Sequence, residues 1–335
     1  MGIAVITFFM STNKAKQLSN SFSTGGGGPT FESRVQSAFV ALMLSYGRCP
    51  CLADRWPIAE VILQTRHRGY ETEDAAIITR DDNTGEQCRL LVQIKHSIRF
   101  TKSDPKMPDV IGAAWRDFNK SSHFDPKLDA IALITGPISK TDSENICRLL
   151  EFARGARDTV DFFQKIRQSK TVSDKQREKL GVIKHHITNA NNGASPDEKK
   201  LWRFLKCFYL IGFDMDLITG VTISLIQSLI GANSNDDVEA VWNKIIQEVQ
   251  QKNLVSGVLT PDSVSQPLQD CFRRKESKPV MAIAPDPIKE TLALNLIGSW
   301  DEKSKGDRMI VEKLSSMAFS DWQAKVREIW KDQRG

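Results

Sequence analysis

A glutamine and a lysine interrupt an apolar segment near the first third of the chain. Residues 91–97 have the sequence LVQIKHS, in which Gln93 and Lys95 stand between apolar neighbours. The continuous apolar run predicts a β-strand covered on both faces. Side chains alternate along a strand, so Gln93 and Lys95 project to one face while Val92 and Ile94 project to the other. An ammonium group beside an amide in a sheet is costly unless another group pairs with it.

Two interpretations fit this segment. In the first it is an edge strand whose outer face is solvated, so that the ammonium group of Lys95 reaches water. In the second, Gln93 and Lys95 belong to a chemical site and a carboxylate lies near them. Substitutions at the two positions are nearly silent in the first case and abolish a reaction in the second.

Two carboxylates suit such a site. Asp74, preceded by Glu73, begins the strand-like segment before residues 89–97, and a hairpin brings it within reach of Gln93 and Lys95. Glu32 lies in the first turn of the first predicted helix. Carboxylate, amide and backbone carbonyl oxygens form a hard ligand set suited to Mg²⁺ or Mn²⁺. A lysine beside such an ion can orient or deprotonate a water molecule, or hold a phosphate. The set predicts phosphodiester hydrolysis.

The surrounding pattern predicts the elements that position these residues. A helical pattern over residues 31–46 precedes three strand-like segments at 58–65, 74–79 and 89–97. The turn-forming sequence RDDNTGEQ separates the last two, which predicts an antiparallel hairpin. A helix over 108–120, a strand over 127–136 and a helix over 142–156 follow. We expect an α/β fold with a mixed sheet flanked by helices.

After about residue 156 the sequence contains no convincing strand pattern. Six segments up to residue 331 have the spacing of amphipathic helices, and the proline-rich residues 279–290 predict a linker or an extended segment. Residues 1–29 are largely polar after Met10 and end in GGGGP, which predicts a flexible leader. The expected organisation is therefore a leader at 1–29, an α/β domain at 30–168 and an all-helical domain at 172–335.

The order of the polar residues resembles the catalytic core of the PD-(D/E)XK nucleases. A helix-borne Glu32 is followed by Asp74 nineteen residues before Gln93-Ile94-Lys95, as in the family variant with glutamine at the middle position. The segments GGGGPTFESRVQSAFVALML, GYETEDAAII, LLVQIKHS and ALITGP resemble the double-stranded DNA endonuclease domain of bacterial antiphage effectors, of the CBASS, Lamassu or antiviral STAND ATPase type. The resemblance covers about residues 25–165 and implies a restriction-endonuclease-like fold.

The resemblance also implies a role for each residue. Asp74 would bind the metal ion, Gln93 would complete its coordination shell, Lys95 would act on the water, and Glu32 would bind a second ion or orient a ligand. Gln93 brings a carbonyl dipole where a family glutamate brings a negative charge, which bears on metal affinity more than on the type of reaction. His96 alternates to the face opposite Lys95, so we expect a structural role for it.

Partners follow from the same resemblance. It implies double-stranded DNA as substrate, and either a homo-oligomer or an ATPase or sensor partner.

The sequence GPISKT at 136–141 is not a phosphate-binding loop, because Ser139 stands where a glycine must precede the lysine. Two functions stay open: a metal-dependent endonuclease, or a catalytically inactive module that binds DNA or protein. Competent groups at all four positions favour the first.

Composition sets broad limits. The 335 residues carry a formal net charge of +5, which permits a polyanionic partner without demanding one. The six scattered cysteines indicate reduced thiols rather than disulfides or a metal site. The first ten residues lack the basic region of a signal peptide, and Met10 opens an ordinary cytosolic start. No window suits a membrane span, so we expect no membrane partner and a cytoplasmic location.

Other candidate motifs have simpler explanations. His185 and His186 lack a partner at metal-ligand spacing, which favours a solvated helix face. The charged run at 272–278, FRRKESK, is expected to be solvated. The aromatic cluster near residue 205 favours core packing over base stacking; its members are Trp202, Phe204, Phe208 and Tyr209.

Overall fold

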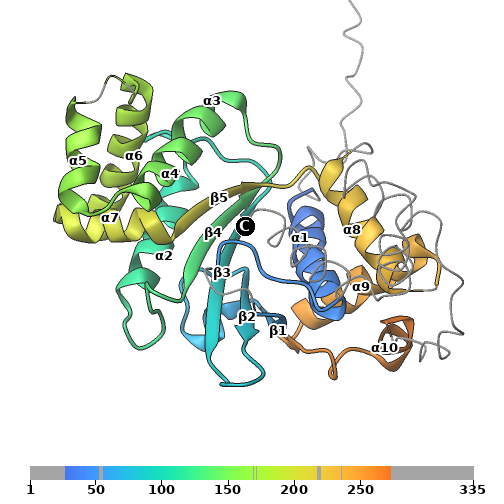
Figure 1. Cartoon of the computed structure of the whole chain (residues 1–335). Helices are drawn as coiled ribbons and strands as arrows, with labels where there is room; N and C mark the ends of the chain where they lie inside the picture. Colours follow the sequence, from blue (N-terminus) through green and yellow to red (C-terminus); the bar gives the residue numbers. More distant parts are fainter. Residues whose placement is uncertain are drawn as a thin grey trace, which may run out of the picture. The chain divides into compact units, whose positions relative to one another are not determined.

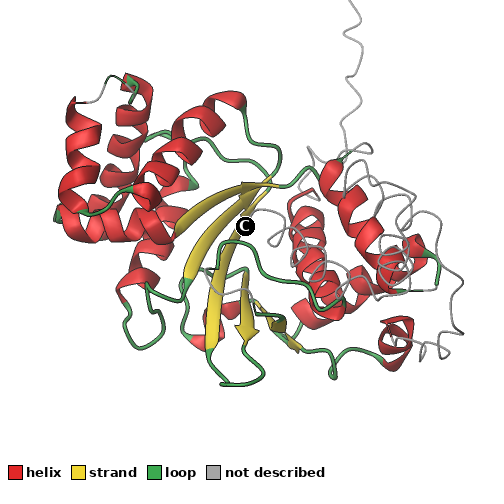
Figure 2. Ribbon diagram, in the orientation of Figure 1, coloured by secondary structure: helices red, strands yellow, loops and turns green. Residues whose placement is uncertain are grey.

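Six strands form one mixed sheet in the order β5-β4-β3-β2-β1-β6 in the computed structural model (Figures 1 and 2). The structure describes residues 27–52, 56–168, 170, 172–216, 220–234 and 236–272. The strands are β1 (Ile58–Leu63), β2 (Ala75–Arg80), β3 (Gln87–Lys95), β4 (Ala130–Thr135), β5 (Phe208–Gly212) and β6 (Val258–Leu259). Neighbours β3, β4 and β5 pair in parallel, and the pairs β1–β2, β2–β3 and β1–β6 are antiparallel. The expected mixed α/β sheet is confirmed.

Helices cover both faces of this sheet (Figure 1). One hydrophobic core contains residues of α1 (Gly27–Leu44), α8 (Val221–Asn233), α9 (Val238–Asn253) and α10 (Gln266–Phe272). The second core contains residues of α2 (Met107–Asn119), α4 (Arg148–Gly155), α5 (Thr159–Gln168), α6 (Asp174–Ala190) and α7 (Glu198–Cys207). The short elements η2 (Thr65–Arg68), α3 (Lys140–Asp142) and the π-helical η3 (Ser143–Cys147) complete the described set. No helix in it is long and apolar enough to cross a bilayer.

The predicted hairpin is confirmed. Strands β2 and β3 pair in register from Ala75 opposite Val92 to Arg80 opposite Gln87. Their connection is held by Asp81, whose Oδ1 accepts a hydrogen bond from the backbone N–H of Asn83 at 2.9 Å. Gly85 adopts a φ of 74°, a left-handed conformation that a residue without Cβ adopts at little cost. Local turn chemistry thus sets the register that positions residues 74 and 93.

Alternation along β3 follows the two cores. Leu90, Val92 and Ile94 enter the core beneath α1, whereas Leu91 enters the core beneath α2. Gln93 therefore shares the α2 face with Leu91, as the pattern predicted. The edge-strand interpretation is wrong, because β3 is flanked by β2 on one side and β4 on the other.

The first helix begins earlier than expected. Helix α1 starts at Gly27, so the last residues of the predicted leader belong to it. Proline is tolerated in the first turn of a helix, where its missing N–H has no intrahelical partner, and Pro29 therefore does not exclude this start. Residues 1–26, including Met10, lie outside the described residues.

The expectation of no strand after residue 156 is wrong. The apolar sequence 208–212, FYLIG, forms β5 rather than the end of a helix, because the free edge of β4 provides a parallel partner. Strand β6 pairs with β1 in the same way. Strands on both sides of the predicted boundary at 168–172 therefore belong to one sheet, although the described residues after it are mainly helical. A division into a cutting part and an assembling part stays a prediction.

Other predictions for the far end of the chain cannot be compared with the structure. The proline-rich residues 279–290, the helix expected at 319–331 and the charged run from residue 273 onward lie outside the described residues. All six cysteines are free thiols.

Candidate active site

Asp74 and Gln93 face each other across the hairpin. Asp74 directly precedes β2, and the pairing of Ala75 with Val92 places it opposite Gln93. The Nε2 amide of Gln93 donates to Oδ2 of Asp74 at 2.6 Å, and the backbone N–H of Ile94 donates to the same oxygen at 2.5 Å. Both side chains are buried. The amide of Gln93 thus holds the carboxylate of Asp74 at the end of the sheet.

Lys95 joins this pair from the end of β3. Its Nζ lies 3.6 Å from Oδ2 of Asp74, and its side chain is 28% exposed against 8% for Asp74. Gln93 and Lys95 line a pocket of about 360 Å³, whose wall also includes Arg66, Lys106 and Arg116. The ammonium group therefore has a buried carboxylate on one side and an open pocket on the other.

Glu32 approaches from α1. Its Oε1 accepts hydrogen bonds from Nε2 of Gln64 at 2.8 Å and from Nε2 of Gln36 at 3.1 Å. Burial, and next the negative charge of Asp74, raise the pKa of Glu32 to about 7, while Gln64, Lys95 and Gln36 act in the opposite direction. Burial also raises the pKa of Asp74, and the charge of Lys95 opposes this rise. The structure therefore brings all four predicted residues to one place, where two carboxylates influence each other.

Two further glutamines support the site, although the sequence did not single them out. Gln36 is fully buried and donates to Glu32 and, at 2.9 Å, to the backbone carbonyl of Asp74. Its position four residues after Glu32 on one helix face was the available signal. Gln64 has a φ of 52°, a left-handed conformation that is uncommon for a residue with a side chain. Nothing local in the sequence indicated that conformation.

His96 points to the other face, as predicted. Its Nε2 lies 2.9 Å from Oδ2 of Asp216, and its ring packs edge-on against Phe31 at a centroid distance of 5.3 Å. Asp216 also accepts a hydrogen bond from Arg34 at 3.1 Å. These contacts join the end of β3 to α1 and to the segment after β5, which is a structural arrangement.

Two predictions outside the site differ in outcome. The prediction of a solvated helix face for His185 and His186 is wrong for His186. This residue is 1% exposed, and its Nε2 lies 3.2 Å from the carbonyl oxygen of Thr101. Burial lowers the pKa of His186. Core packing is confirmed for Phe204 and Phe208, whereas Trp202 and Tyr209 are half-buried.

The oxygen atoms at the site fit a hard cation. The described residues contain no group of three or more His, Cys, Asp or Glu side chains placed to hold a metal ion. Amide oxygens are ligands too, however, and Gln93 supplies one. Within the described chain no hydrogen bond reaches Oδ1 of Asp74, Oε1 of Gln93 or Oε2 of Glu32. These three acceptors, which have no donor among the residues that the structure describes, suit Mg²⁺ or Mn²⁺.

Comparisons with known proteins give a distant structural likeness. A scan against protein-family models and a search of the curated proteins gave no match. The Cap4 SAVED/CARF-domain containing receptor of Acinetobacter baumannii, solved with the cyclic trinucleotide 3'3'3'-cAAA, is similar with a TM-score of 0.39 and 12% identity, over 70% of this chain and 42% of that chain. The Moraxella osloensis Cap4 receptor has a TM-score of 0.38 and 10% identity, over 71% and 45%. The chain spans less than half of these receptors, and the likeness carries no argument on function.

Proposed function

We propose that this chain is a metal-dependent endonuclease that hydrolyses phosphodiester bonds of double-stranded DNA. The observation that supports this proposal is the meeting of Asp74, Gln93 and Lys95 at one end of the sheet. The amide nitrogen of Gln93 and the ammonium group of Lys95 both approach Oδ2 of Asp74. A sheet interior favours apolar side chains, so a buried acid and amide beside a partly exposed ammonium group at a strand end indicate a chemical task.

Each residue has a distinct part in this proposal. The Gln93 amide and the Ile94 N–H fix one oxygen of Asp74, which leaves Oδ1 as a ligand atom. Lys95 is placed to orient the attacking water or to neutralise a phosphate oxygen. Glu32, held by Gln36 and Gln64, offers a second carboxylate. A bound Mg²⁺ or Mn²⁺ ion would polarise the phosphate and lower the pKa of the water.

The pocket beside Lys95 suits a phosphate backbone. Arg66, Lys106 and Arg116 line it together with Lys95, and its acidic lining residues are Glu71, Glu73 and Asp109. Arg66 and Arg116 also pair with Glu73 and Glu71, at 3.3 and 3.4 Å, through side chains that are partly to largely exposed, so water and salt weaken both pairs. Phosphate groups can therefore replace the acidic partners, and binding to DNA is expected to weaken as salt rises.

The biological setting is a finer proposal that rests on the sequence resemblance. An unrestrained nuclease harms its own cell, so we propose that the chain acts as an antiphage effector, with the later helices mediating an activating assembly. Cleavage that rises more steeply than linearly with protein concentration supports this. A rate that stays linear down to nanomolar protein argues against it.

Metal-dependent cleavage tests the central proposal against a non-catalytic DNA-binding module. Linear double-stranded DNA is incubated with micromolar full-length chain in Mg²⁺ and in EDTA, next to the Asp74→Ala variant and the Lys175→Ala control. Lys175 is an exposed residue of α6 and does not line the pocket beside Lys95. Cleavage in Mg²⁺ alone, lost in Asp74→Ala and kept in Lys175→Ala, supports the nuclease. DNA binding without cleavage supports the module.

A further inference from the structure

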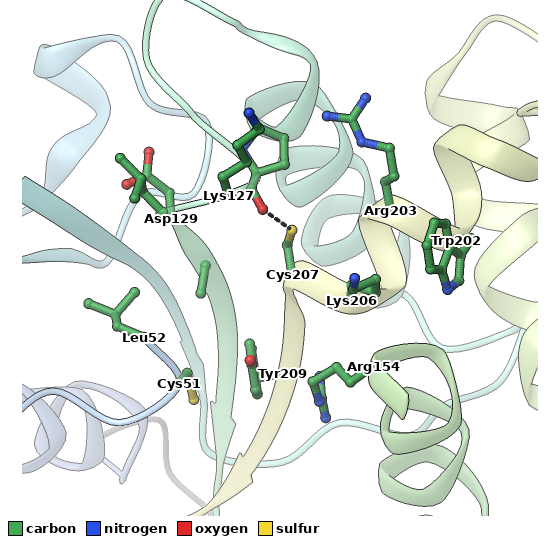
Figure 3. A pocket seen from close by; sticks show the side chains of 13 residues that line it. Cys51, Leu52, Lys127, Asp129, Arg154, Trp202, Arg203, Lys206, Cys207 and Tyr209 are labelled. Carbon is green, nitrogen blue, oxygen red and sulfur yellow. Dashed lines mark hydrogen bonds between the residues drawn. The ribbon is translucent and has the colours of Figure 1, made fainter. Parts of the chain in front are cut away.

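A second pocket lies at the other end of the parallel strands. It has a volume of about 720 Å³ and opens beside the first residues of β4 and β5 (Figure 3). Leu90 pairs with Ala130 and Lys95 with Thr135, so the pocket is five residues of strand away from the candidate active site. At about 3.3 Å per residue this is roughly 16 Å. The two sites are therefore separate, and one small ligand cannot occupy both.

Basic side chains dominate this pocket. Arg154 comes from α4, Arg203 and Lys206 from α7, and Lys127 from the loop before β4 (Figure 3). Arg154 pairs with Glu151 at 2.8 Å. Within the described chain the other three form no salt bridge, and the Lys206 ammonium lies over the face of the Trp202 ring. Three of the four cations in this hollow therefore have no carboxylate partner among the described residues.

The acidic and sulfur groups of the lining do not neutralise these cations. Asp129 accepts hydrogen bonds from the backbone N–H groups of Arg89 and Asp125, both at 2.8 Å, and from the Arg89 guanidinium at 3.2 Å. Burial raises the pKa of the Cys51 thiol to about 12 and that of the Cys207 thiol to about 11, so both are uncharged near neutral pH. The pocket therefore carries a net positive charge.

The remaining wall is apolar and aromatic. The Arg154 guanidinium lies 4.1 Å from the ring centroid of Tyr209, and the Lys206 ammonium lies 4.8 Å from that of Trp202. The Trp202 indole N–H donates to the carbonyl of Ala153 at 2.9 Å, which holds the ring in place. Leu52 and Leu128 extend the apolar surface. Cations beside aromatic and aliphatic groups, in a pocket of this size, suit a ligand with a planar ring and a charged tail.

We propose that this pocket binds a nucleotide, with its phosphates on Lys127, Arg203 and Lys206 and its base against the apolar wall. The volume falls in the range of small-molecule sites. Three cations that have no carboxylate partner among the described residues match the charge of a polyphosphate. The proposal does not depend on nuclease activity, because none of the lining residues belongs to the candidate active site.

Calorimetric titration of the full chain with ATP, in EDTA and low salt, tests the proposal. Adenosine and inorganic triphosphate are titrated as the two halves of the ligand. ATP is expected to bind saturably and more tightly than either half. Absence of saturable binding up to millimolar ATP overturns the proposal, and triphosphate binding as tightly as ATP overturns its nucleotide part.

Variants locate the binding. Lys127→Glu and Arg203→Glu change exposed residues, so both are expected to fold, and each should weaken ATP binding about tenfold or more. Lys199→Glu is the matched control, since Lys199 is an exposed residue of the same helix as Arg203 outside the pocket. Equal weakening by all three shows a non-specific charge effect and overturns the assignment. Asp74→Ala should bind ATP as the wild type does, which separates this result from the nuclease proposal.

Discussion

Asn253, the last residue of α9, donates a hydrogen bond from Nδ2 to Oε1 of Gln36 at 2.7 Å. Gln36 in turn donates to Glu32 and to the backbone carbonyl of Asp74. The side chains of Asn253 and Gln36 therefore link a helix of the later half of the chain to both acids of the candidate site. Because 217 residues separate Asn253 from Gln36, this link forms only in the folded chain.

The first prediction concerns Gln36. Gln36→Leu removes the amide that fixes Glu32 and the Asp74 backbone, and should lower DNA cleavage about 10- to 100-fold through misplaced acids. It should also lower the free energy of unfolding by about 1–3 kcal/mol, because buried partners lose hydrogen bonds.

Ser37→Ala is the control for this change. Ser37 is equally buried on α1, and its hydroxyl donates to the Ser33 carbonyl rather than to the site. It should cost about 1 kcal/mol of stability and leave cleavage unchanged. If both variants cleave at the wild-type rate, Gln36 does not position the acids.

The second prediction concerns Glu32 and pH. Its pKa rises from an ordinary 4.5 to about 7 in the folded chain, so the folded state holds a proton that the unfolded state releases. The stability from this group is complete below pH 4.5 and is lost as pH rises through 7. The glutamine of Glu32→Gln cannot titrate. In EDTA, the melting temperature of this variant relative to that of the wild type should therefore rise as the pH increases from 5 to 8. A constant difference across that range would show that Glu32 has an ordinary pKa.

The third prediction concerns Gln93. In Gln93→Glu a carboxylate replaces the amide that donates to Asp74 at 2.6 Å. Without metal, two neighbouring carboxylates repel each other, so this variant should melt below the wild type in EDTA. A metal ion relieves the repulsion, so Mg²⁺ should raise its melting temperature more than that of the wild type, with cleavage retained. An equal effect of Mg²⁺ on both proteins would contradict a metal site at Asp74 and Gln93.

The sequence predicted the parts of the site that depend on local structure. The turn sequence after β2 set the hairpin register, and alternation in β3 put Gln93 and Lys95 on one face. Together these two local patterns are sufficient to place Asp74 opposite Gln93. Glu32 required the family resemblance as well, because it comes from a separate helix.

The parts that sequence missed depend on distant partners. Gln64 bonds Glu32 only because its backbone is left-handed at the end of β1. The apolar residues 208–212 form a strand because β4 offers an open edge, although the same residues continue a helical pattern. The buried His186 is hydrogen-bonded to the Thr101 carbonyl, which lies 85 residues away in sequence. No window of the sequence contains this information.

Cleavage by Lys95→Ala tests the central claim most directly. Lys95 is part-exposed and its ammonium group lies 3.6 Å from Asp74, so its loss should leave the fold and DNA binding nearly intact. The measurement is the cleavage rate on linear double-stranded DNA in Mg²⁺, with melting temperature and DNA affinity recorded in parallel and with Lys175→Ala as control. We predict a loss of at least about 10²-fold for Lys95→Ala and none for Lys175→Ala. Full cleavage by a folded Lys95→Ala protein would contradict a nuclease site at this position.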